Sequence, residues 1–192
     1  MKKIIILLMA LVTVSLTVQA QTSDRLYYEG KELYDSQDYH EAYPLLLKAA
    51  EMGHKKAQYR VGHCYDKGHG VARNYAKAYY WYLRSAKQGT GKAMYQIGKC
   101  YQHGKGVAKD EKTAFQWFGK AAQQGNADGQ YAVGKCYLRG RGVAANQARA
   151  KSWIMKAIRN PSGGSEVCAQ IKQEAAMGDA DAKKIILLCH II

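Results

Sequence analysis

A unit of 36 residues occurs three times in this chain, and this period constrains the fold more than any other feature. The segment "GHCYDKGHGV" begins at Gly62, "GKCYQHGKGV" at Gly98 and "GKCYLRGRGV" at Gly134. Periods of about 20 to 50 residues are typical of chains that stack one small unit on the next. We therefore expect an array of similar units along most of the chain.

Each unit contains the apolar period of two α-helices. Its second half has apolar or small residues at i, i+3, i+4, i+7 and i+8, counted from Ala78, Ala114 or Ala150, which is one face of a helix. A shorter stretch before it, from Ala57 to Tyr65 in the first copy, has a similar pattern. The sequence predicts an all-α fold of antiparallel helix pairs, with the three alanines at close helix crossings. It also predicts a packed row made of Trp81, Trp117 and Trp153.

A glycine-rich turn in every unit looks at first like a phosphate-binding loop. A P-loop would follow a β-strand and end in Gly-Lys-Ser/Thr, and neither feature occurs here. The first glycine of each turn falls just past the first helix, where a left-handed cap favours glycine, and an Asn or Asp falls where the second helix needs its N-cap. These residues are Gly68, Gly104 and Gly140, followed by Asn74, Asp110 and Asn146. The turn is therefore expected to join two helices.

The first 20 residues, "MKKIIILLMALVTVSLTVQA", have the layout of a secretory signal peptide. The alternative is a membrane anchor, but the polar "QTSD" follows at once. The residue directly after Ala20 is not a cysteine, so a lipid anchor is not expected. Removal of Lys2 and Lys3 with this segment lowers the formal net charge from +14 to +12. We expect an exported bacterial protein, periplasmic or secreted, that is basic and has no membrane span after signal removal.

The rest of the chain divides into four units and a C-terminal segment. The full copies span residues 57–92, 93–128 and 129–160, and a first unit, residues 25–56, has a loop four residues shorter. Two further helical stretches within residues 165–192 are expected to cap the array, because the end of a solenoid needs a cap. The alternative for the apolar "IILLCHII" is a docking edge for a partner or a second copy.

The full unit resembles the Sel-one-like repeat of secreted bacterial proteins, and the first unit resembles its relative, the tetratricopeptide repeat. Ala57, Gly62, Tyr65, Ala78 and Trp81 carry the resemblance, together with the "GHGV" turn. It implies a right-handed superhelical solenoid of antiparallel helix pairs. It also implies a protein-interaction scaffold or adaptor without cofactor or catalysis, which binds on a concave surface lined by the first helix of each pair.

The motifs argue against an enzyme. Some secreted bacterial proteins with such repeats are described as binding or hydrolysing β-lactams, which makes this activity a remote alternative. The Ser-x-x-Lys, Ser-Asp-Asn and Lys-Thr-Gly signatures of that chemistry are absent, as are a G-x-S-x-G elbow and a His-Glu-x-x-His motif. His63 lies next to Cys64, too close for useful zinc ligation. We expect no catalytic residue, bound metal or cofactor.

Five cysteines in an exported chain raise the question of disulfides. Cys64, Cys100 and Cys136 occupy one position of successive units, so a whole unit separates them and we expect buried free thiols. Cys168 and Cys189 lie almost symmetrically about the turn at Gly178, where they could face each other across an antiparallel helix pair. A bridge between these two and a pair of free thiols are both compatible with the sequence.

Two repeated series of residues favour an acidic partner. The first helices carry an aromatic ring and a cation at i and i+4, at Tyr59 and His63, Tyr95 and Lys99, and Tyr131 and Lys135. The turns carry basic or histidine residues on both sides of the first glycine, at Lys67 and His69, His103 and Lys105, and Arg139 and Arg141. The plainer explanation is that the charges are solvated and the tyrosines pack between repeats.

We expect an acidic peptide or protein to lie along this face, held by the tyrosines and steered by the cations. The alternative is an anionic surface polysaccharide, which would bind loosely, through many contacts and with strong salt dependence. Nucleic acid is not expected, because the chain is expected to be exported.

Overall fold

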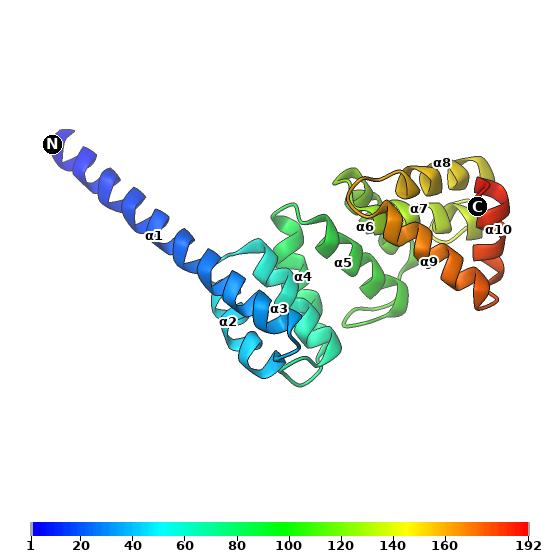
Figure 1. Ribbon diagram of the computed structural model, residues 1–192. Helices are drawn as coiled ribbons and strands as arrows, with labels where there is room; N and C mark the ends of the chain where they lie inside the picture. Colours follow the sequence, from blue (N-terminus) through cyan, green and yellow to red (C-terminus); the bar gives the residue numbers. More distant parts are fainter. Residues whose placement is uncertain (1, 192) are drawn as a thin grey trace. The chain divides into compact units, whose positions relative to one another are not determined.

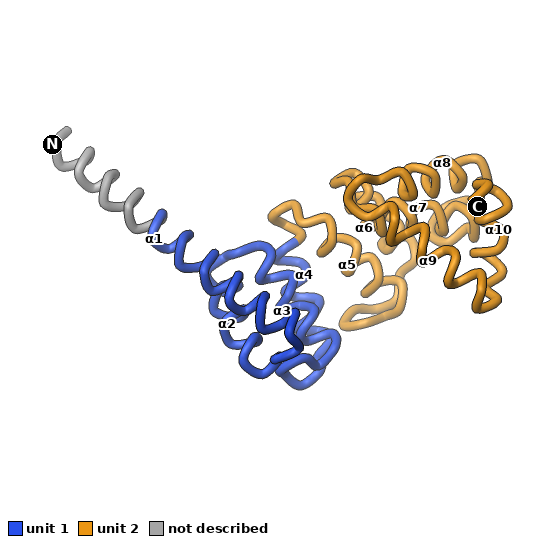
Figure 2. The backbone as a smooth tube through the Cα atoms, viewed as in Figure 1, with its two compact units in different colours: residues 1–85 blue, residues 86–192 orange. Residues whose placement is uncertain are grey.

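Two compact units form the computed structural model, residues 1–85 and residues 86–192 (Figure 2). The structure describes the backbone of residues 2–191 and the side chains of residues 17–191. Over residues 2–191 the regular secondary structure consists of ten α-helices and includes no β-strand (Figure 1). The predicted all-α fold of successive helix pairs is confirmed.

The first unit holds three helices and most of a fourth. They are α1 (Lys2–Asp35), α2 (Tyr39–Glu51), α3 (Lys55–Lys67) and α4 (Tyr75–Lys87), of which the last two residues belong to the second unit. Helix α2 packs against both α1 and α3. The Ser85 hydroxyl on α4 donates a hydrogen bond of 2.8 Å to the Lys55 carbonyl, where α3 begins. Each helix of this unit therefore contacts the next helix in the chain.

The second unit holds six helices. They are α5 (Gly91–His103), α6 (Glu111–Gln123), α7 (Ala127–Arg139), α8 (Gln147–Ile158), α9 (Gly164–Ala176) and α10 (Ala180–Cys189). Each of α5 to α8 packs on the next, and α7 also contacts α5. Helix α9 packs on α7 and α8, and α10 packs on α8 and α9. The last two helices thus form a hairpin on the end of the repeat array.

Apolar side chains anchor this C-terminal hairpin. Val167 and Ile171 on α9 and Ile185 on α10 are fully buried, and they share one hydrophobic cluster with Ile154 and Ala157 of α8. Burial of side chains of this size stabilises a fold by about 1.5–3 kcal/mol each. The predicted packing of the C-terminal stretch against the third full repeat is therefore present in the structure.

The predicted signal peptide covers residues 1–20, and the side chains of residues 1–16 lie outside the described part of the chain. Among the residues that the structure does describe, no helix combines the length and the apolar character needed to cross a membrane.

Glycine on the first helix of a pair lets the second helix approach closely. A Cβ atom added at Gly98 would lie 2.5 Å from ring atoms of Phe118, and one added at Gly134 would lie 2.5 Å from Ile154. Phe118 and Ile154 are 1% and 0% exposed, so the added atom would press on side chains of the buried core. Gly62 has the same relation to a buried tyrosine of α4. This glycine and the large apolar side chain opposite it set the spacing within each pair.

The tryptophan row is packed less deeply than the sequence predicts. Trp81 is buried, but Trp117 and Trp153 are only half-buried. Lys120 and Lys156 place their Nζ atoms 4.2 and 5.0 Å from the centres of these two rings. The residue that follows each tryptophan fills the core instead, because it faces the glycine of the first helix.

The turns form the caps that the sequence predicts. Gly68, Gly104 and Gly140 end the first helices with φ of 79°, 68° and 69°. Asp110 accepts hydrogen bonds from the backbone N–H groups of residues 112 and 113, and Asn146 accepts one from residue 149. The first position of the turn is glycine because its backbone has a left-handed φ. The position before the second helix is Asn or Asp because the first N–H groups of a helix have no intrahelical partner.

The second position of the turn is glycine for a different reason, the close approach of a neighbouring backbone. A Cβ atom at Gly142 would collide with the backbone carbonyl of Glu111, where α6 begins, and Gly70 has the same relation to Tyr39 at the start of α2. The turn of one repeat is therefore seated on the second helix of the preceding repeat. Close backbone approach, and not phosphate binding, accounts for the Gly-x-Gly pattern.

Candidate partner-binding site

Seven of the twelve residues predicted to contact a partner line one cavity in the second unit. The cavity has a volume of about 240 Å³ and is referred to below as the basic cavity. The seven residues are Tyr95, Lys99, His103, Tyr131, Lys135, Arg139 and Arg141. Phe118, Gln102, Ala132, Cys136 and Gln170 complete the lining, which includes no aspartate or glutamate.

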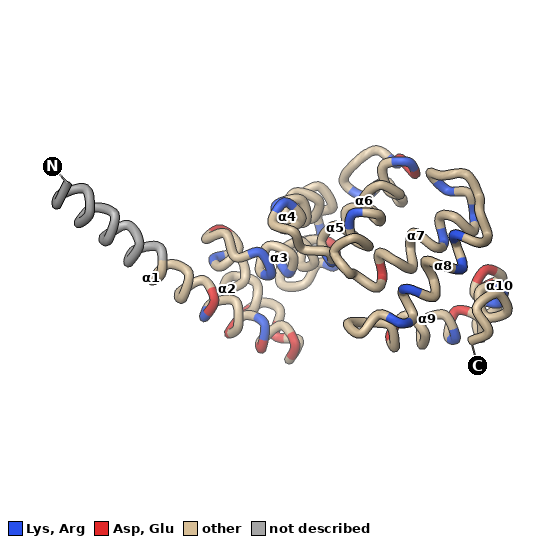
Figure 3. Tube along the Cα trace, turned by 90° about the horizontal axis from the view of Figure 1, so that it is seen from above, with Lys and Arg blue, Asp and Glu red and all other residues tan. Residues whose placement is uncertain are grey.

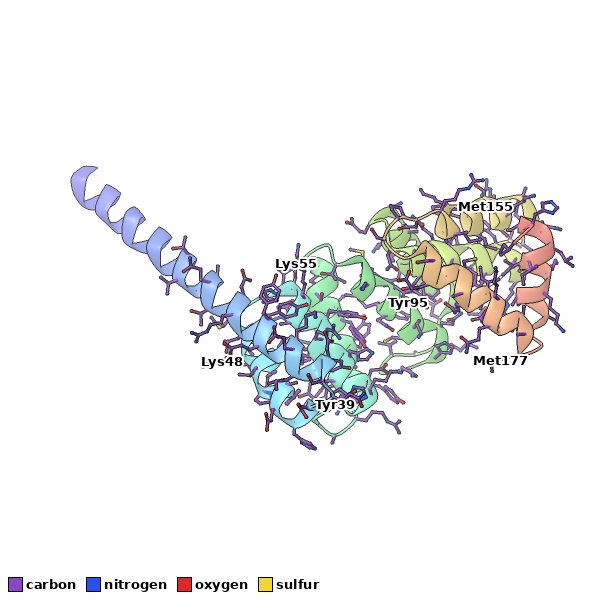
Figure 4. All side chains as sticks on the ribbon, in the orientation of Figure 1. Tyr39, Lys48, Lys55, Tyr95, Met155 and Met177 are labelled. Atoms are coloured by element: carbon purple, nitrogen blue, oxygen red, sulfur yellow. The ribbon has the colours of Figure 1, made fainter. Side chains whose placement is uncertain are left out.

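Helical periodicity pairs each tyrosine with a lysine one turn later. Lys99 Nζ lies 5.6 Å from the centre of the Tyr95 ring on α5, and Lys135 Nζ lies 5.1 Å from the Tyr131 ring on α7. A cation within about 6 Å of a ring is attracted to its π face. Tyr95 extends from α5 (Figure 4) and its ring is 5.7 Å from that of the buried Phe118. The aromatic rings thus give the basic cavity an apolar base.

Carboxylates of the C-terminal hairpin contact the part of the cavity that belongs to α7. Glu174 accepts a hydrogen bond from the Tyr131 hydroxyl at 3.2 Å and from Lys135 Nζ at 3.4 Å. Arg139 pairs with Asp181, and its second contact is with Asp179 at 3.9 Å. Figure 3 shows acidic residues of this hairpin near basic residues of the repeat array. The structure therefore already places acidic groups on a tyrosine, a lysine and an arginine of the predicted site.

Burial and these carboxylates change the protonation behaviour of the site. Burial, followed by the negative charge of Glu174, raises the pKa of Tyr131, so its hydroxyl remains a hydrogen-bond donor at neutral pH. Burial, together with the charges of Lys99 and Lys105, lowers the pKa of His103. His103 is therefore neutral at pH 7 and contributes a polar ring to the cavity, while the lysines and arginines contribute the charge.

Two basic turn residues are outside the basic cavity. Lys105 is half-buried in the second unit but does not line the cavity, and Lys67 is exposed in the first unit. Arg141 is exposed and lines the cavity together with Arg139.

The first-unit copy of the site is organised differently. The Tyr34 hydroxyl lies 2.7 Å from Nδ1 of both His63 and His69. Since a phenol donates only one hydrogen bond, at least one of the two histidines must donate to its oxygen. The Tyr39 ring, labelled in Figure 4, stacks on His69 at 4.0 Å. Tyr59 lies beside His63, with 6.4 Å between ring centres.

Burial, reinforced by the charge of Lys67, lowers the pKa of His63 to about 4. His63 is therefore neutral at pH 7 and is engaged with α1, unlike the lysines at the equivalent positions of the second unit. Sequence reasoning did not find Tyr34, because 29 residues separate it from His63 and no local pattern links the two.

The three repeat cysteines are buried, as predicted, and burial raises the pKa of Cys64 to about 12 and that of Cys136 to about 11. Cys168 and Cys189 are free thiols in the structure, so the bridge that the sequence allowed is not formed. Cys189 packs in the hydrophobic cluster around Ile154. Cys168 follows Val167, a residue of the same cluster, on α9. In the described part of the chain, no three His, Cys, Asp or Glu side chains gather to hold a metal ion.

Successive antiparallel helix pairs of similar length, joined from α3 onward by similar glycine-containing turns, define a protein of the helical repeat class. The particular repeat is the Sel1 repeat, whose family model matches residues 19–54, 55–90, 91–126 and 127–162. The chain belongs to this family. Proteins built from these repeats are generally non-catalytic scaffolds for protein interactions.

Solved bacterial structures have the same fold. A Sel1 repeat protein from Oxalobacter formigenes is 29% identical, with a TM-score of 0.67 over 85% of this chain and 69% of that one. A protective antigen of uropathogenic Escherichia coli strains is 28% identical, with a TM-score of 0.71 over 92% of this chain and 40% of its own length. A putative Sel1 repeat protein from Klebsiella pneumoniae, 22% identical with a TM-score of 0.54, covers 75% of this chain and 71% of its own and shares the fold. No curated protein is similar enough in sequence to count as a match.

Proposed function

We propose that this protein is a non-catalytic scaffold, exported from a bacterial cytoplasm, that binds an acidic segment of a partner protein in the basic cavity. The observation that carries the proposal is the lining of this cavity by tyrosine, lysine and arginine side chains without any carboxylate. Two tyrosine–lysine pairs, one on α5 and one on α7, supply ring contacts and charge at the same place.

The size of the cavity favours part of a larger partner over a free small molecule. Pockets for drug-sized ligands have volumes of about 300–1,000 Å³, and the basic cavity, at about 240 Å³, is smaller. A few side chains of a peptide fit such a volume. Long-range attraction by an exported chain with a net charge of +12, which is +14 less Lys2 and Lys3, would steer an acidic partner toward it.

An anionic polysaccharide is the second candidate, and a separate surface of the second unit favours it. An open depression of about 770 Å³ is lined by Lys151, Lys156 and Arg159, among other residues. Lys156 also lies over the half-buried Trp153 ring. Aromatic and cationic side chains on an open surface suit a polymer that binds through many weak contacts.

Charge reversal inside the basic cavity tests the main proposal. The variant Lys99→Glu/Arg141→Glu should bind a fluorescent peptide of alternating glutamate and alanine at least tenfold more weakly than the unmodified chain. The control variant Lys87→Glu/Lys112→Glu has the same change in net charge at exposed residues outside the cavity. The control variant should melt near the unmodified chain, since exposed charges contribute little to stability. Lys99 is half-buried, so a thermal melt of Lys99→Glu/Arg141→Glu must show that this variant remains folded at the temperature of the binding assay.

Equal loss of peptide affinity in both variants would mean that only net charge matters, and the basic cavity would not be the site. Affinity unchanged by Lys99→Glu/Arg141→Glu would direct attention to the exposed Leu187 on α10. Retention on an anionic polysaccharide that depends on Lys151 and Lys156, and not on Lys99, would favour the second candidate.

A further inference from the structure

The turn between α9 and α10 behaves as an acidic segment bound to the chain itself. Its sequence, "EAAMGDAD", covers residues 174–181 and places carboxylates at the end of one helix and at the start of the next. Met177, labelled in Figure 4, marks this turn. Glu174 contacts Tyr131 and Lys135, while Asp181 pairs with Arg139.

Repeat symmetry relates these contacts to the rest of the basic cavity. Tyr131, Lys135 and Arg139 of α7 follow Tyr95, Lys99 and His103 of α5 by one repeat, and all six line the same cavity. The α7 set holds carboxylates of the hairpin. The α5 set repeats the tyrosine and the lysine at the same helical spacing, so acidic groups of the same kind suit it.

We propose that the basic cavity binds an acidic helix-turn segment of the partner that is chemically like "EAAMGDAD"; this inference rests on the proposed function. Glu174 and Asp181 then compete with the partner segment for Lys135 and Arg139. The partner segment would reach the α5 set first and displace the internal carboxylates from the α7 set. The chain would thereby carry an internal competitor that sets the affinity of its own binding face.

The two kinds of contact that hold the hairpin make such competition feasible. The ion pairs are partly solvated, since the side chains of Lys135, Glu174, Arg139 and Asp181 are 25–27% exposed. Because solvent reaches these pairs, salt screens them. The apolar contacts of Ile171 and Ile185, by contrast, are fully buried. The carboxylates can therefore release their partners while the hairpin stays in place.

Neutralising the internal carboxylates provides the test. The variant Glu174→Gln/Asp181→Asn keeps the shape of both side chains but removes their charges. At low salt it should bind a fluorescent "EAAMGDAD" peptide about fivefold more tightly than the unmodified chain. This is the ratio expected when the ion pairs of an internal competitor, worth about 1 kcal/mol, are removed. The control variant Glu41→Gln/Glu166→Gln has the same change in net charge at exposed residues that do not line the cavity. It should gain less than twofold. A peptide "QAAMGNAN" should bind neither chain.

Each outcome distinguishes this inference from the proposed function. If the unmodified chain binds the acidic peptide and Lys99→Glu/Arg141→Glu weakens it, but Glu174→Gln/Asp181→Asn binds no tighter than its control, the competition is wrong and the scaffold function stands. If no chain prefers the acidic peptide to the neutral one, both are wrong. Circular dichroism checks that the hairpin remains folded, and the single variant Glu174→Gln replaces the double variant if that one unfolds.

Discussion

Replacement of Gly98 by alanine should destabilise the second unit, although alanine is the better helix former. In a helix interior, alanine is favoured over glycine by about 1 kcal/mol. At Gly98, however, the new Cβ atom would lie 2.5 Å from two ring atoms of Phe118, closer than packed carbon atoms approach. The Phe118 ring is 1% exposed and packs with Ala114, Ala122 and Val133, so its displacement would disturb the core of the second unit. Overpacking of this kind costs about 1–3 kcal/mol, and the full contact at this site should outweigh the gain in helix propensity.

Gly119 on α6 provides a matched control for the same chemical change. A Cβ atom added there would meet nothing within 4 Å. Gly119→Ala should therefore stabilise the chain by about 0.5–1 kcal/mol through helix propensity alone. Thermal and urea denaturation, followed by circular dichroism, should thus shift in opposite directions for the two glycine variants.

The pair Gly98→Ala and Phe118→Leu checks the cause of the destabilisation. Leucine lacks the Cε1 and Cζ atoms that the new methyl group meets, so the double variant should lose less stability than the sum of the two single changes. The reasoning would be refuted if Gly98→Ala were as stable as Gly119→Ala, or if the two changes were simply additive.

Three further predictions follow from the burial and capping of single residues. Because the folded pKa of His63, about 4, lies below its unfolded value of about 6.5, its contribution to stability is present above pH 6.5 and is lost as the pH falls toward 4. The free energy of unfolding, measured by urea denaturation, should fall by about 1–2 kcal/mol over this range, and by less in His63→Gln. Cys64 should react with a thiol reagent only slowly in the native chain, and the denatured chain should titrate five free thiols, whereas three would indicate a bridge. Asn146→Ala should cost about 1 kcal/mol through loss of the α8 N-cap, while alanine at the exposed neighbour Gln147 should change little.

The tyrosine–lysine pairs of the basic cavity could be anticipated from the sequence because they are periodic. The tyrosine–lysine pairs lie at i and i+4 on helices whose period is visible in the sequence, and the structure brings the copies on α5 and α7 to one cavity. The first-unit copy could not be anticipated in this way. His63 looks like Lys99 and Lys135 in the alignment of the repeats, but Tyr34 of α1 accepts or donates its hydrogen bond there.

The sequence by itself determined the elements and their order. Apolar spacing gives the helices, left-handed glycines such as Gly140 end them, and caps such as Asn146 start the next, because each of these effects acts within a few residues. Only the tertiary structure decided which side chains meet across helices. Glu174 reaches Lys135 over 39 residues, and Phe118, not Trp117, fills the space over Gly98. A period specifies which face of a helix is apolar, but the depth of burial and the charges that meet there depend on how closely the backbones approach.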